Sequence, residues 1–410
     1  MAFSRRTRTV WAYWRAERRT LRQGLVALVL STLAGFVAGL TLAHLTGTLD
    51  RLPGLLVLIP AAVGMRGTIF GAIGARLGTE SAVGSFEPNL ARDGALYRNG
   101  YVAVVTTLSS ALWLAVLARL VSAASGQPSI SVWSLVTVSV VGGALGSMLI
   151  LLVTVGLSVL SFRRGWDLDS VSTPMVTALG DMVTLPTLFL ASLLLENATV
   201  NAVVSAVCLL VAVFAIWRSF ATHVPGVRRI VLEMTAVIVL TPVLDVLAGS
   251  LLQSREPELL AFPAVLLLIP PFVSQAGALG GIFSSRVASK LQLGVIRPRG
   301  WPEPPALLDA SVVLGSGLAV FALIGSVAFG LAVLTHVDHP GVGSMIGGTL
   351  LAGVMTLPVL LAVSYELAIL TARFGLDPDN HGVPIITSVM DLVGVVAILV
   401  AMTIVGITVT

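Results

Sequence analysis

Charged residues are scarce in this chain of 410 residues, since only 11% are Asp, Glu, Lys or Arg. A soluble domain carries about a quarter. Hydrophobic residues make up 56% of the chain, and long apolar runs recur along nearly its whole length. An apolar run of about 20 residues spans a bilayer as a helix. The low charge therefore excludes a soluble globular protein and predicts an all-α protein that crosses the membrane many times.

Other residue types are equally informative by their rarity. Cys208 is the only cysteine, which excludes an internal disulfide. Aromatic residues are only 6% of the chain, fewer than an aromatic-lined pocket for an organic substrate would favour. The net charge of +4 is interpreted as a sign of membrane topology rather than of nucleic-acid binding. We expect the lipid bilayer and ions as partners, with no nucleic acid and no organic cofactor.

Eleven apolar segments are predicted to span the membrane: 24–46, 54–79, 99–123, 131–161, 172–195, 200–220, 229–252, 262–290, 307–335, 343–373 and 382–408. Residues 1–22 carry seven arginines and no apolar core followed by a cleavage site, so we expect a basic cytoplasmic tail. With that tail inside, basic residues on the inner side outnumber those on the outer side by 20 to 3. This bias predicts a cytoplasmic N-terminus and an external C-terminus in a prokaryotic inner or plasma membrane.

Two stretches, 167–181 and 377–391, are copies of each other. Each opens with an Asp-x-Asp pair and continues with a proline, a threonine and one aspartate inside an apolar run. The differences 377−167 and 391−181 are both 210, and the same interval relates Ile59-Pro60 to Ile269-Pro270. Internal repeats of this kind are typical of transport proteins.

The interval predicts a first five-helix repeat at 23–195, a linker helix within 196–224 and a second five-helix repeat at 225–410. Five spans alone would leave the second copy inverted, and the extra span at 200–220 restores its orientation. We therefore expect parallel repeats related by a pseudo-twofold axis along the membrane normal. The alternative is a re-entrant linker with inverted repeats; Arg228 and Arg229, on the inner side, favour the parallel arrangement.

The fifth span of each repeat carries an aspartate in hydrocarbon, Asp181 and Asp391. Each lies seven residues, or about 10 Å along a helix, beyond a proline that suits a first helical turn. Thr177 and Thr387 lie four residues earlier on the same helix face. A charge at membrane depth costs about 2.5–3.5 kcal/mol and marks a functional site by default. The alternative is a structural aspartate that is protonated or paired with an arginine.

The second span of each repeat is rich in small and polar residues after a proline. Small residues allow a close approach of backbones, and a proline followed by glycines exposes carbonyl groups to a water-filled cavity. We interpret these residues as pore lining, with plain helix packing as the alternative. They are Gly64, Gly67, Thr68 and Gly71 in the first copy, and Ser274, Gln275, Gly277, Ala278 and Gly281 in the second.

Further charged residues flank or enter the spans. Asp245 has Gly35 as its counterpart and breaks the symmetry; it is predicted to neutralise Arg66, to bind a coupling ion or to pair within the bundle. Acidic loop residues are predicted to concentrate cations at the cytoplasmic mouth, or else only to aid solubility and helix initiation. These loop residues are Asp167, Asp169, Asp377 and Asp379. Carboxylates, hydroxyls and carbonyls together suit a hard divalent cation such as Mg²⁺.

Two motifs resemble those of the MgtE family of magnesium channels and transporters. They are Pro-x-x-x-Gly-x-Arg-Gly from Pro60 and Asp-x-Asp…Pro…Thr-x-x-x-Asp ending at Asp181 and Asp391. The tandem arrangement is similar to the animal solute-carrier branch of that family, over residues 23–410. The resemblance implies transport of a divalent cation, most of all Mg²⁺, through a pore between the repeats, with both aspartates as ligands and no enzymatic activity. Since one chain supplies both halves, it also implies that a monomer suffices.

The family's Gly-Asn dipeptide in the second span is replaced by Gly67-Thr68 and Gly277-Ala278, which leaves cation selectivity open. Two other functions stay as alternatives. One is transport of another small substrate. The other is an intramembrane aspartyl protease, because residues 178–181, Ala-Leu-Gly-Asp, approach a Gly-x-Gly-Asp motif.

Overall fold

The structure is a computed structural model that describes residues 11–15, 18–82, 91, 94–164, 168–222, 227–375 and 381–407. These residues form helices and connecting turns without a strand, which confirms the predicted all-α fold. Within the described part, nine helices are long and apolar enough to cross a membrane, and two shorter apolar helices lie at Leu28–His44 and Leu179–Leu195. Each of these helices overlaps one of the eleven predicted ranges, while the count of eleven spans stays a prediction.

The helices gather into two compact units. The first-repeat unit is Val37–Leu260, and the second-repeat unit is Met1–Phe36 together with Ala261–Thr410. The first-repeat unit contains α3 (Thr46–Arg51), α4 (Leu55–Ala82), α5 (Ala95–Ala124), α6 (Val132–Arg164), α7 (Leu168–Ser192), the 3₁₀ turn η1 (Leu193–Leu195), α8 (Ala198–Ala221), α9 (Val227–Ser254) and most of α10 (Glu256–Ala261). The second-repeat unit contains α11 (Ala264–Gln292), α12 (Pro304–Leu334), α13 (Val342–Phe374), α14 (Val383–Ile404) and α2 (Arg18–His44) as far as Phe36.

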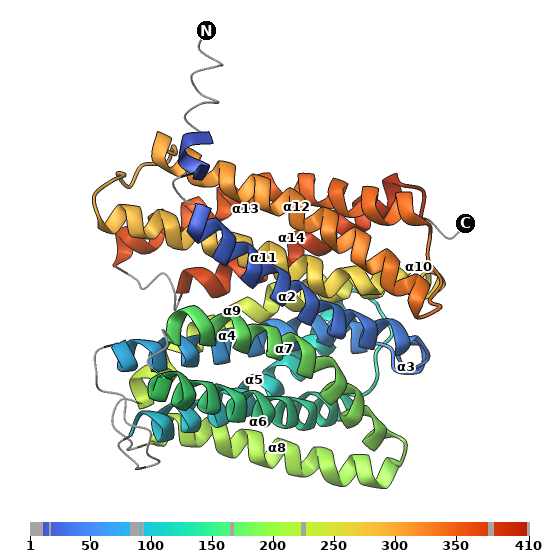
Figure 1. Ribbon diagram of the computed structural model, residues 1–410. Helices are drawn as coiled ribbons and strands as arrows, with labels where there is room; N and C mark the ends of the chain where they lie inside the picture. Colours follow the sequence, from blue (N-terminus) through green and yellow to red (C-terminus); the bar gives the residue numbers. More distant parts are fainter. Residues whose placement is uncertain are drawn as a thin grey trace. The chain divides into compact units, whose positions relative to one another are not determined.

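Each unit is built around the second helix of its repeat. In the first-repeat unit α4 packs against α5, α6, α7 and α9, while α8 covers α5 and α6 (Figure 1). In the second-repeat unit α11 packs against α12, α13 and α14 (Figure 1). The helices at equivalent positions of the two repeats therefore make equivalent contacts. This agrees with a tandem repeat in the sequence.

The first helices are exchanged between the repeats. On α9, the first helix of the second repeat, a Cβ at Gly249 would lie 2.3 Å from the carbonyl oxygen of Val57 on α4. On α2, the first helix of the first repeat, a Cβ at Gly35 would lie 2.7 Å from Cα of Pro271 on α11. Both crossings bring backbones together in the way that small residues allow. The compact units therefore differ from the predicted sequence repeats in the first helix of each repeat, and the linker helix α8 lies in the first-repeat unit.

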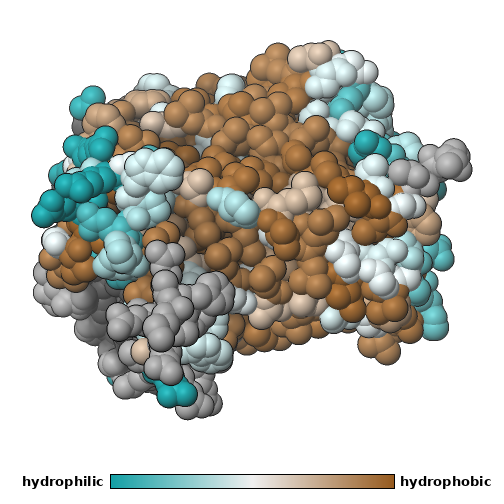
Figure 2. Space-filling view, turned by 90° about the horizontal axis from the view of Figure 1, so that it is seen from above, coloured by the Kyte–Doolittle hydropathy of each residue, from teal (hydrophilic) through white to brown (hydrophobic). Residues whose placement is uncertain are grey.

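Apolar side chains cover the outer faces of the helices, as contact with lipid requires. On α8 the exposed residues include Val203, Leu210 and Phe214, and on α13 they include Val354. Figure 2 shows a face of the molecule on which hydrophobic residues form a broad central band with hydrophilic residues at its two ends. A band of this kind is typical of a surface within a bilayer.

We expect Gly249→Ala to destabilise the first-repeat unit, because the added methyl group meets backbone atoms of Val57 that cannot rotate away. Overpacking of this kind typically costs about 1–3 kcal/mol. Thermal unfolding of the purified protein in detergent measures the loss. Gly156→Ala on α6 is the matched control, because no described atom lies within 4 Å of the added carbon. Equal unfolding temperatures for the two variants would contradict the close crossing.

Candidate cation site

The two predicted aspartates are both buried within their own units. Asp181 on α7 is 5% exposed, and Asp391 on α14 is 7% exposed. α7 packs against α4 and α6, and α14 packs against their counterparts α11 and α13. Each carboxyl group is therefore withdrawn from the outer surface into a bundle of apolar helices. Such a position is typical of functional carboxylates in membrane proteins.

The structure brings two predicted site residues together in the second-repeat unit. A Cβ at Gly277 on α11 would lie 2.5 Å from Cγ2 of Thr387 on α14. The hydroxyl of Thr387 donates to the carbonyl oxygen of Val383 at 2.6 Å, so its lone pairs point away from that bond. Because Thr387 lies one turn before Asp391, the crossing at Gly277 sets how α11 passes the acidic face of α14.

Gln275 is the most unusual of the predicted pore-lining residues. Its side chain is fully buried, and neither its amide oxygen nor its amide nitrogen has a hydrogen-bond partner among the described residues. A buried amide without partners is costly, typically about 1–3 kcal/mol. The amide is therefore available to a ligand or to water that enters the second-repeat unit.

The other predicted pore-lining residues vary in burial. Ser274 and Ala278 are half-buried, and a Cβ at Gly281 would lie 3.6 Å from Cγ1 of Val383 on α14. In the first-repeat unit the half-buried residues on α4 are Gly64, Gly67, Thr68 and Gly71. Their role in lining a pore stays a prediction.

The described residues do not include all of the predicted site. Asp167, Asp377 and Asp379 lie outside them, and the side chains of Asp169 and Thr177 are likewise not described. The cytoplasmic mouth therefore stays a prediction. Among the described residues no group of three or more His, Cys, Asp or Glu side chains is placed to hold a metal ion.

Asp245 and Arg66 are both buried in the first-repeat unit. Asp245 on α9 is 1% exposed and lies one turn from Gly249, on the face that meets α4. Arg66 on α4 is 4% exposed, and its Nη2 donates to the carbonyl oxygen of Gly142 at 2.9 Å. No ion pair of Arg66 is present within the described residues. The three roles suggested for Asp245 stay predictions.

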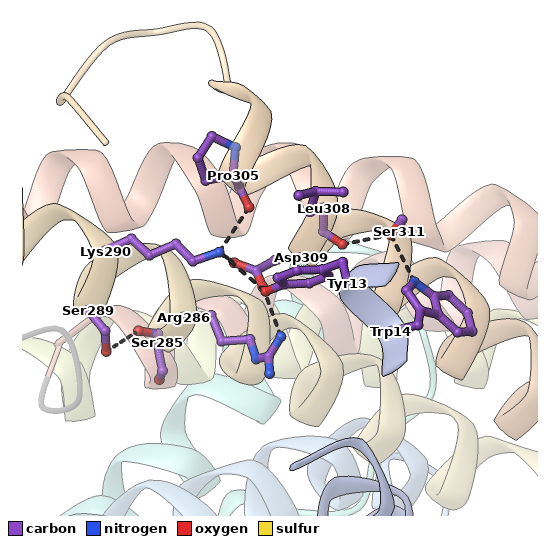
Figure 3. Close-up of polar contacts among 10 residues, drawn as sticks. All are labelled: Tyr13, Trp14, Ser285, Arg286, Ser289, Lys290, Pro305, Leu308, Asp309 and Ser311. Carbon is purple, nitrogen blue, oxygen red and sulfur yellow. Dashed lines mark hydrogen bonds and ion pairs between the residues drawn. The ribbon is translucent and has the colours of Figure 1, made fainter. Parts of the chain in front are cut away.

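A polar cluster that the sequence reasoning missed lies in the second-repeat unit (Figure 3). Asp309 on α12 is fully buried and forms ion pairs with Arg286 at 2.8 Å and with Lys290 at 2.5 Å, both on α11. The hydroxyl of Tyr13 donates to Asp309 Oδ1 at 2.6 Å. The sequence did contain a signal for this cluster. Asp309 lies near the start of an apolar run, and Arg286 and Lys290 precede that run. The counterpart of Asp309 in the first repeat is Asn99, which is uncharged.

The cluster holds residues 11–15 against α12 (Figure 3). Trp14 Nε1 donates to the hydroxyl of Ser311 at 3.1 Å. Its indole ring occupies the space above Gly315, where a Cβ would lie 2.4 Å from Trp14 Cη2. An apolar ring, a glycine and a buried ion-pair network thus anchor this segment of the chain.

Comparisons with known proteins agree with the repeat. The model of the family MgtE, described as divalent cation transporter, matches residues 59–191 and again 269–401. The starts and the ends of the two matches are 210 residues apart (269−59 and 401−191). The second match thus reproduces the interval at which the two aspartates recur.

The chain is also similar to curated animal proteins. Solute carrier family 41 member 3 of Rattus norvegicus is 25% identical over 394 residues, which cover 92% of this chain and 85% of the relative. The protein of the same name from Mus musculus is 25% identical over 358 residues, 83% of this chain and 73% of the relative. Solute carrier family 41 member 2 of Mus musculus is 25% identical over 359 residues, which cover 82% of this chain and 62% of the relative. No solved structure matches the chain.

We expect Gly277→Ala to lower stability by about 1–3 kcal/mol, because the new methyl group collides with Thr387 Cγ2. Adding Thr387→Ser to this variant should restore the lost stability, since serine lacks Cγ2 and keeps the hydroxyl. Thermal unfolding of both single variants and the double variant measures the coupling. Thr387→Ser alone is the control and should resemble the unchanged chain. A double variant no more stable than Gly277→Ala would contradict the contact.

We expect Asp309→Asn to destabilise the second-repeat unit by about 3–5 kcal/mol, because it leaves Arg286 and Lys290 without their buried acid. Tyr13→Phe should cost only about 1 kcal/mol, since it removes one hydrogen bond. Thermal unfolding compares the two. If Asp309→Asn cost no more than Tyr13→Phe, the ion pairs would not stabilise the unit.

Proposed function

Because the chain belongs to the MgtE family of divalent cation transporters, we propose that it carries Mg²⁺ across the membrane with Asp181 and Asp391 as ligands of the passing ion. Proteins of this family are transporters and not enzymes, so the alternative of an intramembrane aspartyl protease is set aside. The long apolar helices make the chain an integral membrane protein. The family match also favours a divalent cation over another small substrate.

The recurrence of a buried carboxyl group at the same place in both repeats carries this proposal. An acid in hydrocarbon costs about 2.5–3.5 kcal/mol on insertion scales, and the chain bears that cost twice. A divalent cation that meets such acids offsets their charge. Mg²⁺ suits this arrangement because it keeps several waters and binds one or two carboxylates rather than a full protein cage.

The surroundings of the aspartates support the same ion. Thr387 adds a hydroxyl oxygen one turn from Asp391. The buried amide of Gln275 on α11 offers a further oxygen within the same unit. The ligands on offer are therefore oxygens, which a hard cation prefers. We further propose that the ion passes through a pore between the repeats, and that the loop acids gather cations at its cytoplasmic mouth.

The topology is also a proposal. The excess of arginine and lysine in the predicted inner loops supports a cytoplasmic N-terminus and an external C-terminus. The same proposal places the chain in a prokaryotic inner or plasma membrane. Since both repeats lie on one chain, we propose that a monomer transports.

We expect Asp181→Asn and Asp391→Asn each to lower Mg²⁺ uptake into proteoliposomes by about tenfold, and the double variant to abolish it. Losing a charge-assisted ligand costs about 1.5–3 kcal/mol, and 1.4 kcal/mol corresponds to a factor of ten. Asp338→Asn is the control, because Asp338 is exposed in the loop between α12 and α13. Thermal unfolding shows that each variant is folded.

Unchanged Mg²⁺ uptake in a folded double variant would reject both aspartates as ligands. The same vesicles, loaded in turn with Mn²⁺, Ca²⁺ and Co²⁺, give the selectivity. Repeating the uptake with and without a sodium or proton gradient separates coupled transport from passive flow.

A further inference from the structure

Arg66 lies in the interior of the first-repeat unit with part of its charge unmatched. Its Nη2 donates to the carbonyl oxygen of Gly142, whereas Nη1 is buried and has no hydrogen-bond partner among the described residues. No acid pairs with Arg66 in that part of the chain. A buried cation without a counter-charge is strongly unfavourable, so the site favours a negative partner.

Arg66 lines a small cavity between α4, α5 and α6. The cavity has a volume of about 20 Å³, enough for one particle slightly larger than a water molecule. No acidic side chain lines it. Its polar lining consists of Arg66 and four hydroxyl groups, those of Thr107, Ser110, Ser139 and Ser147.

Three of the four hydroxyl groups that line the cavity already donate a hydrogen bond within the described residues, and one does not. Ser110 and Ser139 donate to the carbonyl oxygens of Thr107 and Ala111, at 3.0 and 2.6 Å. Thr107 donates to the hydroxyl oxygen of Ser147 at 3.1 Å. The proton of Ser147 has no acceptor among the described residues and is therefore available. Arg66 Nη1 and the Ser147 hydroxyl are thus two donors without acceptors on residues that line the cavity, and such donors suit an anion.

The second repeat fills the equivalent place instead. The counterparts of Ala62 and Ala111, 210 residues later, are Phe272 and Phe321. Both rings are fully buried and stack with their centroids 4.4 Å apart. The counterpart of Arg66 is Ala276. The cavity is therefore not a packing defect common to both repeats, because it accompanies the arginine.

Gly146 on α6 leaves room for the guanidinium group of Arg66. A Cβ at Gly146 would lie 3.1 Å from Cζ and from Nε of Arg66. Its counterpart in the second repeat, where no arginine is present, is Thr356. The first repeat thus supplies the arginine, the glycine that leaves room for its side chain and the cavity, whereas the described part of the second repeat has none of these three features.

We propose that this cavity binds one small monovalent anion of the size of chloride, held by Arg66 Nη1 and the Ser147 hydroxyl. One negative charge neutralises the arginine and satisfies both free donors. A space of this size suits a monatomic anion better than sulfate or gluconate. This site is separate from the proposed cation ligands, and its test does not depend on transport.

Thermal unfolding of the purified chain in detergent tests the proposal, with sodium chloride exchanged for sodium gluconate at constant ionic strength. The unfolding temperature should rise saturably with chloride and with bromide, because an anion that binds only the folded state stabilises it. Arg66→Gln should abolish this dependence. Ser147→Ala should raise the midpoint concentration about tenfold, since it removes one hydrogen bond to a charged partner.

Ser158→Ala is the matched control, because Ser158 lies on the same helix, donates to the carbonyl oxygen of Thr154 and does not line the cavity. If Arg66→Gln does not fold, equilibrium binding of radioactive chloride to the unchanged chain tests the proposal. One chloride site per chain is expected. Equal unfolding temperatures in chloride and gluconate, together with no saturable chloride binding, would overturn the proposal and leave water in the cavity. A chloride dependence that survives in Arg66→Gln would overturn it as well.

Discussion

The cost of a charge in hydrocarbon is the constraint on which this structure depends. With so few charged residues, each buried one requires its own compensation. Asp309 receives it from two basic side chains and a tyrosine hydroxyl within the chain. Arg66 receives only a carbonyl oxygen from the described residues, and the proposed anion supplies the remainder. Asp181 and Asp391 are proposed to bind a divalent cation in transit, which adds a compensation that comes from solution.

Close crossings at glycine are the second determinant of the fold. Helices in lipid gain nothing from hydrophobic burial against one another, so close packing of small residues selects their neighbours. Gly249 lies on Val57, Gly35 on Pro271 and Gly277 on Thr387, and each crossing joins different helices. The first two attach the opening helix of each repeat to the second helix of the other. The third positions α11 beside the helix that carries Asp391.

The sequence predicted the membrane class, the helix ranges and the repeat with good accuracy, because apolar runs and a fixed interval are local or countable signals. It did not predict the exchange of the first helices. Helices that are apolar on all sides carry little periodicity to show which face meets which neighbour. For the same reason Asp309 was missed, since its partners come from another helix and from Tyr13.

The candidate site also has features that the sequence predicted and features that it did not. Asp181 and Asp391 stood out because carboxyl groups are rare in apolar runs, and both are indeed buried. The free amide of Gln275 and the cavity beside Arg66 arise only when several helices meet. The alanines at 62 and 111 leave the cavity open, and the phenylalanines at 272 and 321 fill the equivalent place. These pairs lie on two different helices, so no pattern along one helix shows that they meet.

The exchanged opening helices have a consequence for biosynthesis. Gly35 contacts Pro271, which is synthesised 236 residues later (271−35). At a translation rate of about 5–20 residues per second, α2 waits roughly 10–50 s for its partner. During that interval α2 lacks its contact with α11, although its apolar stretch Leu28–His44 suits a lipid environment. The second-repeat unit thus includes the segment that is synthesised first, so it cannot be complete until the last helices of the chain have been made.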